Sequence, residues 1–365
     1  MAPSQDVTVD KNGTKSQGMI EVRRLDSTKG EAVFATVNIS RGTRIAAEVP
    51  LIMIPPTSDN EEVLEFFKAS DQVPDDKLSE MVHILCQLSV TESIREDQHI
   101  RREAWTFYKN KKWRDRDGNT LQGKKLARAV KKTINLCAIY LTHNVQLGPG
   151  GKYGSGVFSL YSRINHSCAP NAHNSWNPTM KRLTLHATQD LKAGDQIFVN
   201  YIGHVCRTRQ QRAFSLFATW GITCECEACT EPTIDQLRHR MLVTDQALAA
   251  YACGASEESN FSAVHGIPRI ATPQEALKAA EELVQLLKRQ RLYGMELYIK
   301  SDDDGRYREC SNYAFDSGLY DKALEYALKE LELERLLIGT ETGHLQDEPS
   351  GAEYWVDHVR MQIIR

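Results

Sequence analysis

Residues 163–171 read Arg-Ile-Asn-His-Ser-Cys-Ala-Pro-Asn, and residues 224–229 read Cys-Glu-Cys-Glu-Ala-Cys. The first segment places the polar residues Asn165 and His166 between an apolar approach and a Pro-Asn turn. Such groups are either buried hydrogen-bonding residues or ligand contacts. A satisfied polar turn beneath a sheet explains this segment equally well.

The second segment brings three cysteines within six residues, in a knuckle short enough for all three thiolates to reach one metal ion. Structural zinc takes four ligands in a tetrahedron, so a fourth ligand must come from elsewhere in the chain. The candidates are Cys168, Cys206, Cys253 and several histidines. Three free thiols are the alternative, but free cysteines are seldom packed this densely.

Between these segments, residues 194–201 read Gly-Asp-Gln-Ile-Phe-Val-Asn-Tyr and predict a turn followed by a strand that ends at Tyr201. Taken alone, this pattern says little about function, because a tyrosine at the end of a strand is most often half-buried packing.

The chain has 365 residues, a formal net charge of -3 and a hydrophobic fraction of 41%. This length allows two domains of ordinary size, and the charge gives no general sign of nucleic-acid binding. The polar N-terminus does not resemble a secretory leader, and no apolar run reaches the roughly 20 residues that span a bilayer. The nine cysteines are unevenly spaced, unlike a secreted disulfide framework. We therefore expect a soluble protein of the nucleus, the cytoplasm or both, without membrane contact.

Changes in the spacing of apolar residues divide the chain into segments. Residues 1–18 are polar and predict a disordered lead-in, whereas the pattern from Met19 onward predicts β-strands, with one long strand over residues 44–54. Apolar residues three and four apart predict a helical insertion over about residues 58–143. After the three-cysteine segment the chain is predicted to be helical, and small residues around Gly318 are typical of a tetratricopeptide-type hairpin.

The order of these motifs resembles the SET domain followed by its post-SET zinc site. Asn-His-Ser-Cys-x-Pro-Asn comes first, then the Gly-Asp turn and strand to Tyr201, then the three-cysteine segment. Residues 29–42 and 48–52 resemble the opening motif of that domain and the strand after it. The resemblance covers residues 19–230 and implies an α+β fold, in which small SET-domain sheets carry the helical insertion and a post-SET zinc knuckle. Residues 232–365 are expected to form an all-α, tetratricopeptide-like domain.

Within this family the chain resembles the SET-and-MYND group and its fungal relatives, which carry a helical C-terminal domain. Only Cys86 and Cys137 lie between residues 50 and 144, too few for the two-zinc MYND finger. The missing finger and the run Trp-Gly-Ile-Thr-Cys-Glu-Cys at residues 220–226 favour the fungal branch.

The resemblance implies a protein-lysine N-methyltransferase that uses S-adenosyl-L-methionine. Tyr201 matches the catalytic tyrosine. The positions that match cofactor-binding residues are Lys29, Gly30, Asn144, Asn165, His166 and Trp220, and those that match zinc ligands are Cys168, Cys224, Cys226 and Cys229. Four thiolates close the coordination shell, so the implied zinc is structural. The implied partner is a protein that presents the target lysine, histone or non-histone, and we expect a monomer.

Two positions depart from the family pattern. Ala32 stands where the opening motif has its second glycine, and Glu31 stands where relatives are often basic. Because a Cβ restricts φ and a carboxylate repels the cofactor's own carboxylate, these departures favour an alternative, a SET-fold scaffold or protein-interaction module with weak catalysis. Asn165, His166 and Tyr201 match the family and favour the enzyme. A zinc hydrolase or nucleic-acid-binding finger is disfavoured, because four thiolates leave no open coordination position.

Residues 109–132 are strongly basic, with ten lysines and arginines against two aspartates. A basic insert beside a SET core can attract an acidic partner, including nucleosomal DNA. The remainder of the chain is neutral or acidic, so we expect a solvated helix face and an exposed loop rather than a direct nucleic-acid contact.

Overall fold

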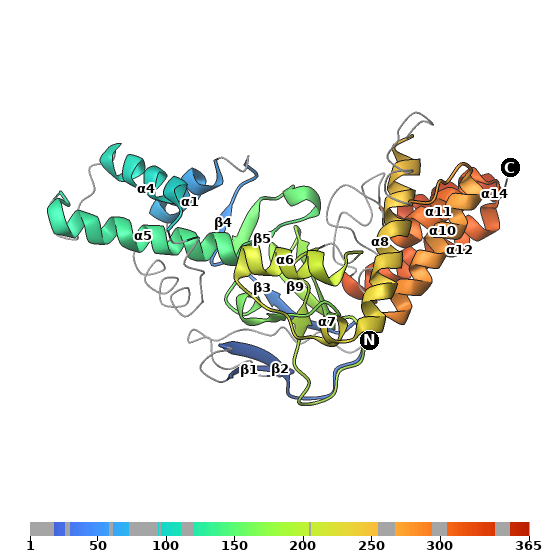
Figure 1. Ribbon diagram of the computed structural model, residues 1–365, viewed down its shortest axis with the longest axis horizontal. Helices are drawn as coiled ribbons and strands as arrows, with labels where there is room; N and C mark the ends of the chain where they lie inside the picture. Colours follow the sequence, from blue (N-terminus) through green and yellow to red (C-terminus); the bar gives the residue numbers. More distant parts are fainter. Residues whose placement is uncertain are drawn as a thin grey trace.

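The computed structural model describes residues 18–25, 30–57, 61–72, 94, 96–110, 120–203, 206–254, 267–293, 305–339 and 351–364. Short β-strands form the middle of the molecule, a helical arm projects from one side of them, and a bundle of helices lies on the other side (Figure 1). The predicted lead-in, apart from Gly18, and Lys29 fall outside the described residues.

The described strands form four small sheets. In sheet order they are β1 (Ile20–Arg24) with β2 (Glu31–Ala35); β3 (Arg44–Glu48), β9 (Arg182–Ala187) and β8 (Ala172–Asn177); β4 (Ile52–Ile54), β6 (Ser155–Val157) and β5 (Val145–Gln146); and β10 (Phe198–Val199) with β7 (Asn165–His166). Strands this short cannot bury a core alone. Three of the sheets contribute to one core, in which Ile20, Ile45, Leu185 and Val199 come from four different strands, whereas β4 and β6 pack with the helical arm.

The single strand predicted over residues 44–54 is wrong. The chain instead forms β3 and β4, which belong to different sheets. Pro50 lies between them and has no N–H to donate to a ladder, so it interrupts the strand. The backbone N–H of Leu51 then donates to the carbonyl of Val157 at 2.8 Å, which starts the pairing of β4 with β6.

The parallel pair β7–β10 brings two distant motifs together, with Asn165 opposite Phe198. Asn171 reinforces the pair, because its side-chain amide donates to the carbonyl of Gln196 at 2.8 Å and accepts from the N–H of Phe198 at 2.8 Å. The chain leaving β10 therefore carries Tyr201 past β7. Tyr201 lies two residues beyond the strand, and not at its end as predicted.

The helical arm consists of α1 (Glu62–Gln72), α4 (Gln98–Asn110) and α5 (Gly123–His143), within the predicted insertion. Its core contains Phe66, Phe67, Ile100, Val130 and Tyr140. The last turns of α5 pack into the β-rich middle, where the helix ends at Asn144 with an extended backbone. The end of α5 thereby places Asn144 in the middle of the molecule.

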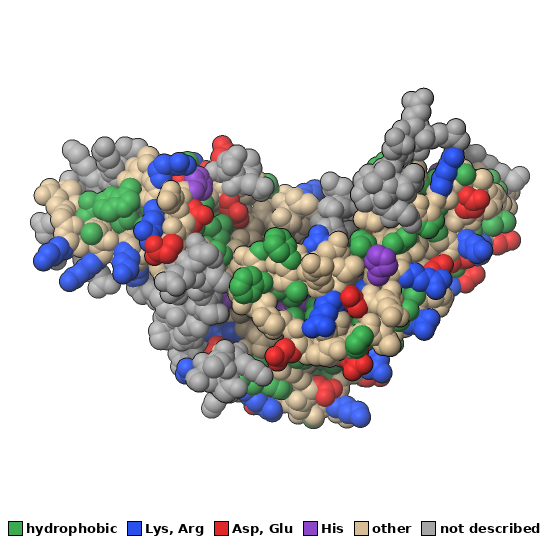
Figure 2. All heavy atoms as spheres, in the orientation of Figure 1, with side chains coloured by type: hydrophobic (Ala, Val, Ile, Leu, Met, Phe, Trp, Pro, Cys, Tyr) green, Lys and Arg blue, Asp and Glu red, His purple; other side chains and the backbone are tan. Residues whose placement is uncertain are grey.

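The first half of α5 exposes a row of cations, which are Lys124, Lys125, Arg128, Lys131 and Lys132. The helix contains no acidic residue, and lysine and arginine side chains line the lower edge of the arm in Figure 2. The other part of the basic stretch, residues 111–119, lies outside the described residues.

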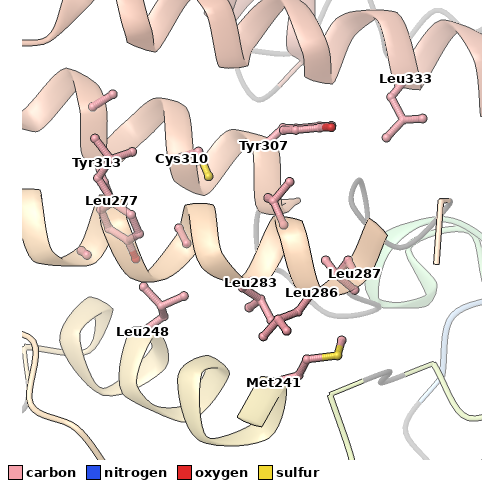
Figure 3. Packing of buried hydrophobic residues seen from close by; sticks show 14 of the residues in the cluster. Met241, Leu248, Leu277, Leu283, Leu286, Leu287, Tyr307, Cys310, Tyr313 and Leu333 are labelled. Atoms are coloured by element: carbon pink, nitrogen blue, oxygen red, sulfur yellow. The ribbon is translucent and has the colours of Figure 1, made fainter. Parts of the chain in front are cut away.

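The helical C-terminal region that the sequence predicts is confirmed. It contains α8 (Pro232–Ala252), α10 (Pro273–Arg289), α11 (Arg306–Asp316), α12 (Tyr320–Leu337) and α14 (Ala352–Ile363). Figure 3 shows side chains such as Met241, Leu248 and Leu283 interlocking between α8, α10 and α11. Gly318 turns the chain between α11 and α12 with a φ of 73°, a left-handed value that suits glycine.

The C-terminal region contacts the β-rich middle directly. A Cβ on Gly42 would lie 2.7 Å from Cγ of Leu336 in α12, so the turn after β2 needs a glycine for this approach. The guanidinium of Arg41 lies over the ring of Tyr293 at 5.6 Å. Among the described residues, the helices are all too short or too polar to cross a membrane.

Candidate active site

A pocket opens where the end of α5, the segment after β10 and the end of α6 (Arg209–Trp220) meet. It holds about 430 Å³ of space continuous with solvent, and its lining includes Asn144, Tyr161, Ser162, Tyr201 and Trp220. The structure thus brings together three residues that the sequence predicts for the site from positions far apart in the chain. Those three are Asn144, Tyr201 and Trp220.

Both the side chain and the backbone of Tyr201 are hydrogen-bonded in this pocket. Its hydroxyl donates to the backbone carbonyl of Ile164 at 2.6 Å, and its backbone N–H donates to Nδ1 of His166 at 3.1 Å. Its ring lies 5.3 Å from the ring of Trp220, whose indole N–H donates to the carbonyl of Thr142 at 2.8 Å. Burial raises the pKa of Tyr201 above its usual value, so the hydroxyl remains protonated at neutral pH.

His166 connects Tyr201 to the cysteines. Burial lowers the pKa of His166 to about 4, so the imidazole is neutral. Because Nδ1 accepts from Tyr201, the proton resides on Nε2, which lies 3.3 Å from Sγ of Cys168 and donates to it. Both ring nitrogens therefore serve protein partners, and a contact from His166 to a cofactor would have to come from its backbone.

Four cysteines form one cluster, in which all Sγ atoms lie within 4.8 Å of one another. They are Cys168, Cys224, Cys226 and Cys229. The Sγ of Cys168 is 3.6 Å from that of Cys229 and 4.0 Å from that of Cys224. A tetrahedral zinc with Zn–S bonds near 2.3 Å requires S–S separations of about 3.8 Å. The four thiols are therefore spaced to take a zinc ion.

The other fourth-ligand candidates lie elsewhere. Cys206 is buried in the core of the helical C-terminal region, and Cys253 is exposed after α8. The short helix α7 (Glu227–Thr230) shapes the knuckle, since the N–H of Cys229 donates to the carbonyl of Cys226 at 2.8 Å.

Glu31 is paired with a buried arginine. The Nε of Arg163 donates to Oε2 of Glu31 at 2.7 Å, and the Arg163 side chain is only 4% exposed. The amide of Asn165 also donates to the backbone carbonyl of Glu31 at 3.3 Å. The Glu31 carboxylate is therefore turned toward Arg163, which compensates its charge.

Ala32 also fits its position. It is fully buried in β2, a regular strand in which a Cβ is sterically allowed, and it pairs with Arg23 of β1. The left-handed residue of this turn is Gly30, with a φ of 69°. The turn therefore has its glycine where the backbone requires one.

Sequence reasoning missed Ser162 and Glu48. The Oγ of Ser162 is buried, lines the pocket and has no hydrogen-bond partner in the structure. The carboxylate of Glu48 accepts from the backbone N–H groups of Leu160 and Tyr161 at 2.7 and 3.1 Å, and so fixes the turn that carries Ser162. The available signals were a serine directly before the Arg-Ile-Asn-His motif and a lone carboxylate in an apolar run.

A family model, that of the SET domain, matches residues 30–202. This stretch is a SET domain, and it contains Tyr201 and the rest of the pocket lining except Trp220, which follows it in the chain. The small sheets and the helical insertion that the resemblance implies are the architecture observed in this part of the chain.

The relatives of the chain are lysine methyltransferases. It is 28% identical over 193 residues to "Histone-lysine N-methyltransferase set5" of Schizosaccharomyces pombe, a match that covers 51% of this chain and 53% of the relative. It is 32% identical over 85 residues to "N-lysine methyltransferase SMYD2" of Homo sapiens, covering 23% of this chain and 19% of the relative. The chain thus spans about half the length of the first relative, or less of others.

A solved structure, "Crystal structure of the SET domain of LSMT bound to Lysine and AdoHcy", aligns over 92% of this chain and 93% of its own, with 15% identity. The TM-score is 0.35, so this similarity adds nothing to the assignment from the family model.

Proposed function

We propose that this protein is an S-adenosylmethionine-dependent protein-lysine N-methyltransferase. The observation that carries this proposal is the convergence on one pocket of Asn144 and Tyr201 from the SET domain and Trp220 from α6, which follows it. The named activities of the fungal and animal relatives support the same reaction.

Two polar groups in the pocket support the binding of a polar cofactor. The Oγ of Ser162 is buried without a partner, and the side-chain amide of Asn144 makes one long hydrogen bond, 3.5 Å to the carbonyl of Leu141. The aromatic rings of Tyr161, Tyr201 and Trp220 present faces that attract a cation. Bound S-adenosylmethionine supplies an electrophilic methyl group on its sulfonium sulfur.

The aromatic walls also suit the nucleophile. A lysine amine must be neutral to attack a methyl group, yet the pKa of free lysine is about 10.4. The positive sulfonium of the bound cofactor, together with partial burial in the pocket, disfavours the ammonium form and lowers that pKa. The amine then loses its proton to solvent, and the chain needs no strong base of its own.

Tyr201 orients the reactants in this scheme. Its hydroxyl remains protonated and is fixed by the 2.6 Å hydrogen bond to the carbonyl of Ile164. The hydroxyl oxygen of Tyr201 and the carbonyl oxygen of Ile164 therefore lie next to each other. An oriented hydroxyl and carbonyl position the amine and the polarised methyl group for in-line transfer. Tyr201 therefore acts by orientation and not by removing a proton.

The cysteine cluster is proposed to bind one structural zinc ion. Its four thiols have the spacing of a closed tetrahedral site, which leaves no position for activating water. A zinc ion there would fix Cys168, and Cys168 is hydrogen-bonded to His166, which holds the backbone of Tyr201. The metal thereby supports the geometry of the catalytic tyrosine from behind the pocket.

The substrate is proposed to be a protein lysine, with histones as the first class to test because relatives carry that name. Action on histones would place the protein in the nucleus. The helical C-terminal region, from residue 232 onward, is proposed to be a separate domain beside the substrate cleft.

Replacement of Tyr201 by Phe tests the reaction. The variant should retain zinc, fold and S-adenosylmethionine affinity while methyl transfer to histones falls about a hundredfold, the scale of one oriented transition-state donor. Tyr354→Phe, on an exposed ring of α14, is the matched control and should retain full turnover. Undiminished turnover in Tyr201→Phe would mean that this tyrosine only packs.

The scaffold alternative makes a different prediction for the unmodified protein. Calorimetric titration with S-adenosylmethionine should show binding if the chain is an enzyme. Glu31 is paired with Arg163 and Ala32 lies in a regular strand, so neither departure from the family pattern argues against cofactor binding. Absence of binding would defeat the enzyme and favour the scaffold.

A further inference from the structure

Behind the cysteine cluster, α6 buries the side chain of Arg212, and the residue is 1% exposed. Its guanidinium donates to the carbonyls of Arg207 and Ala228 at 2.6 and 2.7 Å, and Nη2 lies 3.8 Å from Sγ of Cys229. Its Nε is buried without a partner. In the part of the chain that the structure describes, no carboxylate forms an ion pair with Arg212.

An arginine in this position is costly without a counter-charge. A guanidinium is always protonated, and a buried charge that lacks an ionic partner destabilises a protein by several kcal/mol. The two carbonyls offer dipoles to Arg212 but no net charge. The groups in contact that can carry negative charge are the cysteine thiolates, beginning with Cys229.

A metal-loaded cysteine cluster would carry the negative charge that the buried guanidinium of Arg212 requires. Four thiolates and one divalent zinc ion together carry roughly two negative charges in a closed site of this kind. Such a dianion is also costly to bury, and the arginine and the cluster compensate each other at hydrogen-bond distance.

We propose that Arg212 is the buried counter-charge of the metal centre and that it sets the zinc affinity of the cluster. The proposal rests on the structural zinc proposed above and adds a residue outside the ligand set. Arg212 stabilises the thiolate form of the cluster through Cys229, while the loaded cluster stabilises the buried guanidinium in return.

A second guanidinium reaches the cluster from the helical C-terminal region. Arg238, in α8, is fully buried and donates to the carbonyl of Cys168 at 2.8 Å. Arginines from α6 and α8 thus contact the two separate cysteine segments. Loading the cluster with metal would therefore also strengthen the attachment of α8 to the SET domain.

The test compares Arg212→Met with Arg209→Met. Both changes remove one arginine from α6, but Arg209 is exposed. Competition with a chromophoric chelator should show that Arg212→Met weakens zinc binding by about 10- to 100-fold, the usual effect of losing a group that supports a metal ligand. Arg209→Met should bind zinc as the unmodified protein does. Arg212→Lys keeps the charge but loses the planar fork, so its affinity should lie between.

Thermal unfolding with and without zinc separates this role from simple packing. Zinc should raise the Tm of the unmodified protein more than that of Arg212→Met, because ligand stabilisation follows affinity. Without zinc, Arg212→Met should be at least as stable as the unmodified protein, since it removes an uncompensated buried charge. Equal losses of Tm in both states with unchanged zinc affinity would overturn the proposal.

The remaining outcomes also decide between the proposals. If Arg212→Met does not fold, Arg212→Gln, which also removes the charge but keeps a polar side chain, provides the same measurement, and unchanged zinc affinity in that variant together with unchanged cobalt(II) absorption would reject the role. If the unmodified protein binds no zinc, the structural zinc site fails and takes this inference with it. If the unmodified protein and Arg212→Met bind zinc equally, the inference alone fails.

Discussion

The helical C-terminal region and the cysteine cluster both bury arginines, but they compensate the charges in different ways. In the helical region, Arg308 donates to Oε2 of Glu330 at 2.7 Å, and Arg306 contacts Asp245 and Glu309. Beside the cysteines, Arg212 has carbonyls and a thiol as neighbours.

The difference separates a region that supplies its own counter-charges from one that needs an added ion. In the helical region, carboxylates fold against Arg306 and Arg308, so the charges of these two arginines are balanced by the chain. The cysteine cluster gathers four thiols beside the guanidinium of Arg212. The charges of the thiols and the guanidinium become complementary once the thiols are ionised around a metal. Stability should therefore depend on zinc near the cluster and on side-chain pairs in the helical region.

The largest effect should follow removal of a cluster cysteine. Elemental analysis should find about one zinc per chain in the unmodified protein and far less in Cys168→Ser, because a closed tetrahedral site needs all four ligands. Since Cys168 also accepts from His166, methyl transfer should be lost as well. Cys253→Ser, on the exposed cysteine after α8, is the matched control and should keep zinc and activity. Full zinc occupancy in Cys168→Ser would remove Cys168 from the ligand set.

A smaller effect should follow when the ion pair of the helical region is broken. Glu330→Gln removes the negative charge that lies 2.7 Å from the buried guanidinium of Arg308, and should lower the free energy of unfolding by about 3 kcal/mol. Zinc content should not change, because this pair is remote from the cysteines. Denaturant unfolding gives the first quantity and elemental analysis the second. Coupled loss of zinc would contradict the separation between the two regions.

A moderate functional effect is expected at Glu31. Glu31→Gln removes the carboxylate that pairs with the buried Arg163, and so loosens the turn at Gly30. Affinity for S-adenosylmethionine should fall about tenfold, the scale of one charge-assisted hydrogen bond, while zinc content stays constant. Calorimetry measures the affinity, and Glu21→Gln on β1 in the same hairpin is the control because its pair with Arg23 is half exposed. Equal affinity in both variants would show that the pair does not position the turn.

Sequence patterns predicted the parts of this site whose chemistry lies within one short segment. The Cys-x-Cys-x-x-Cys spacing by itself indicates a metal, because the ligands are neighbours in the chain. The resemblance then supplied Cys168 and Tyr201, and the structure places Cys168 within the cluster and Tyr201 in the pocket.

The parts that escaped prediction depend on contacts between distant segments. Glu31 and Arg163 are 132 residues apart and pair only after the turn at Gly30 packs on the Asn-His segment. The sequence alone predicts that the Glu31 carboxylate repels the carboxylate of the cofactor, because it gives no sign of the pairing with Arg163. Pro50 marked the break between β3 and β4, but apolar residues continue on both sides of it. Periodicity reports burial along one segment and contains no information about its partner across the fold.

The smallest predicted effects concern two serines that extend the same comparison. The hydroxyl of Ser317, in the helical region, donates to the carbonyl of Tyr313 at 2.6 Å, whereas the buried hydroxyl of Ser162 in the pocket has no partner. An unsatisfied buried hydroxyl destabilises a fold, and a satisfied one contributes about 1 kcal/mol. Ser317→Ala should therefore lower the Tm slightly and leave S-adenosylmethionine binding unchanged.

Ser162→Ala should have the opposite pattern. Its Tm should stay constant or rise, because the substitution removes a group that the protein alone does not satisfy. Its affinity for S-adenosylmethionine, or its KM for the lysine substrate, should worsen about three- to tenfold, which corresponds to the loss of one neutral hydrogen bond to a ligand. Calorimetry and steady-state kinetics distinguish the two ligands. If Ser162→Ala lowers the Tm and leaves both affinities unchanged, the hydroxyl stabilises the fold, and the pocket binds its ligands through Asn144 and the aromatic rings alone.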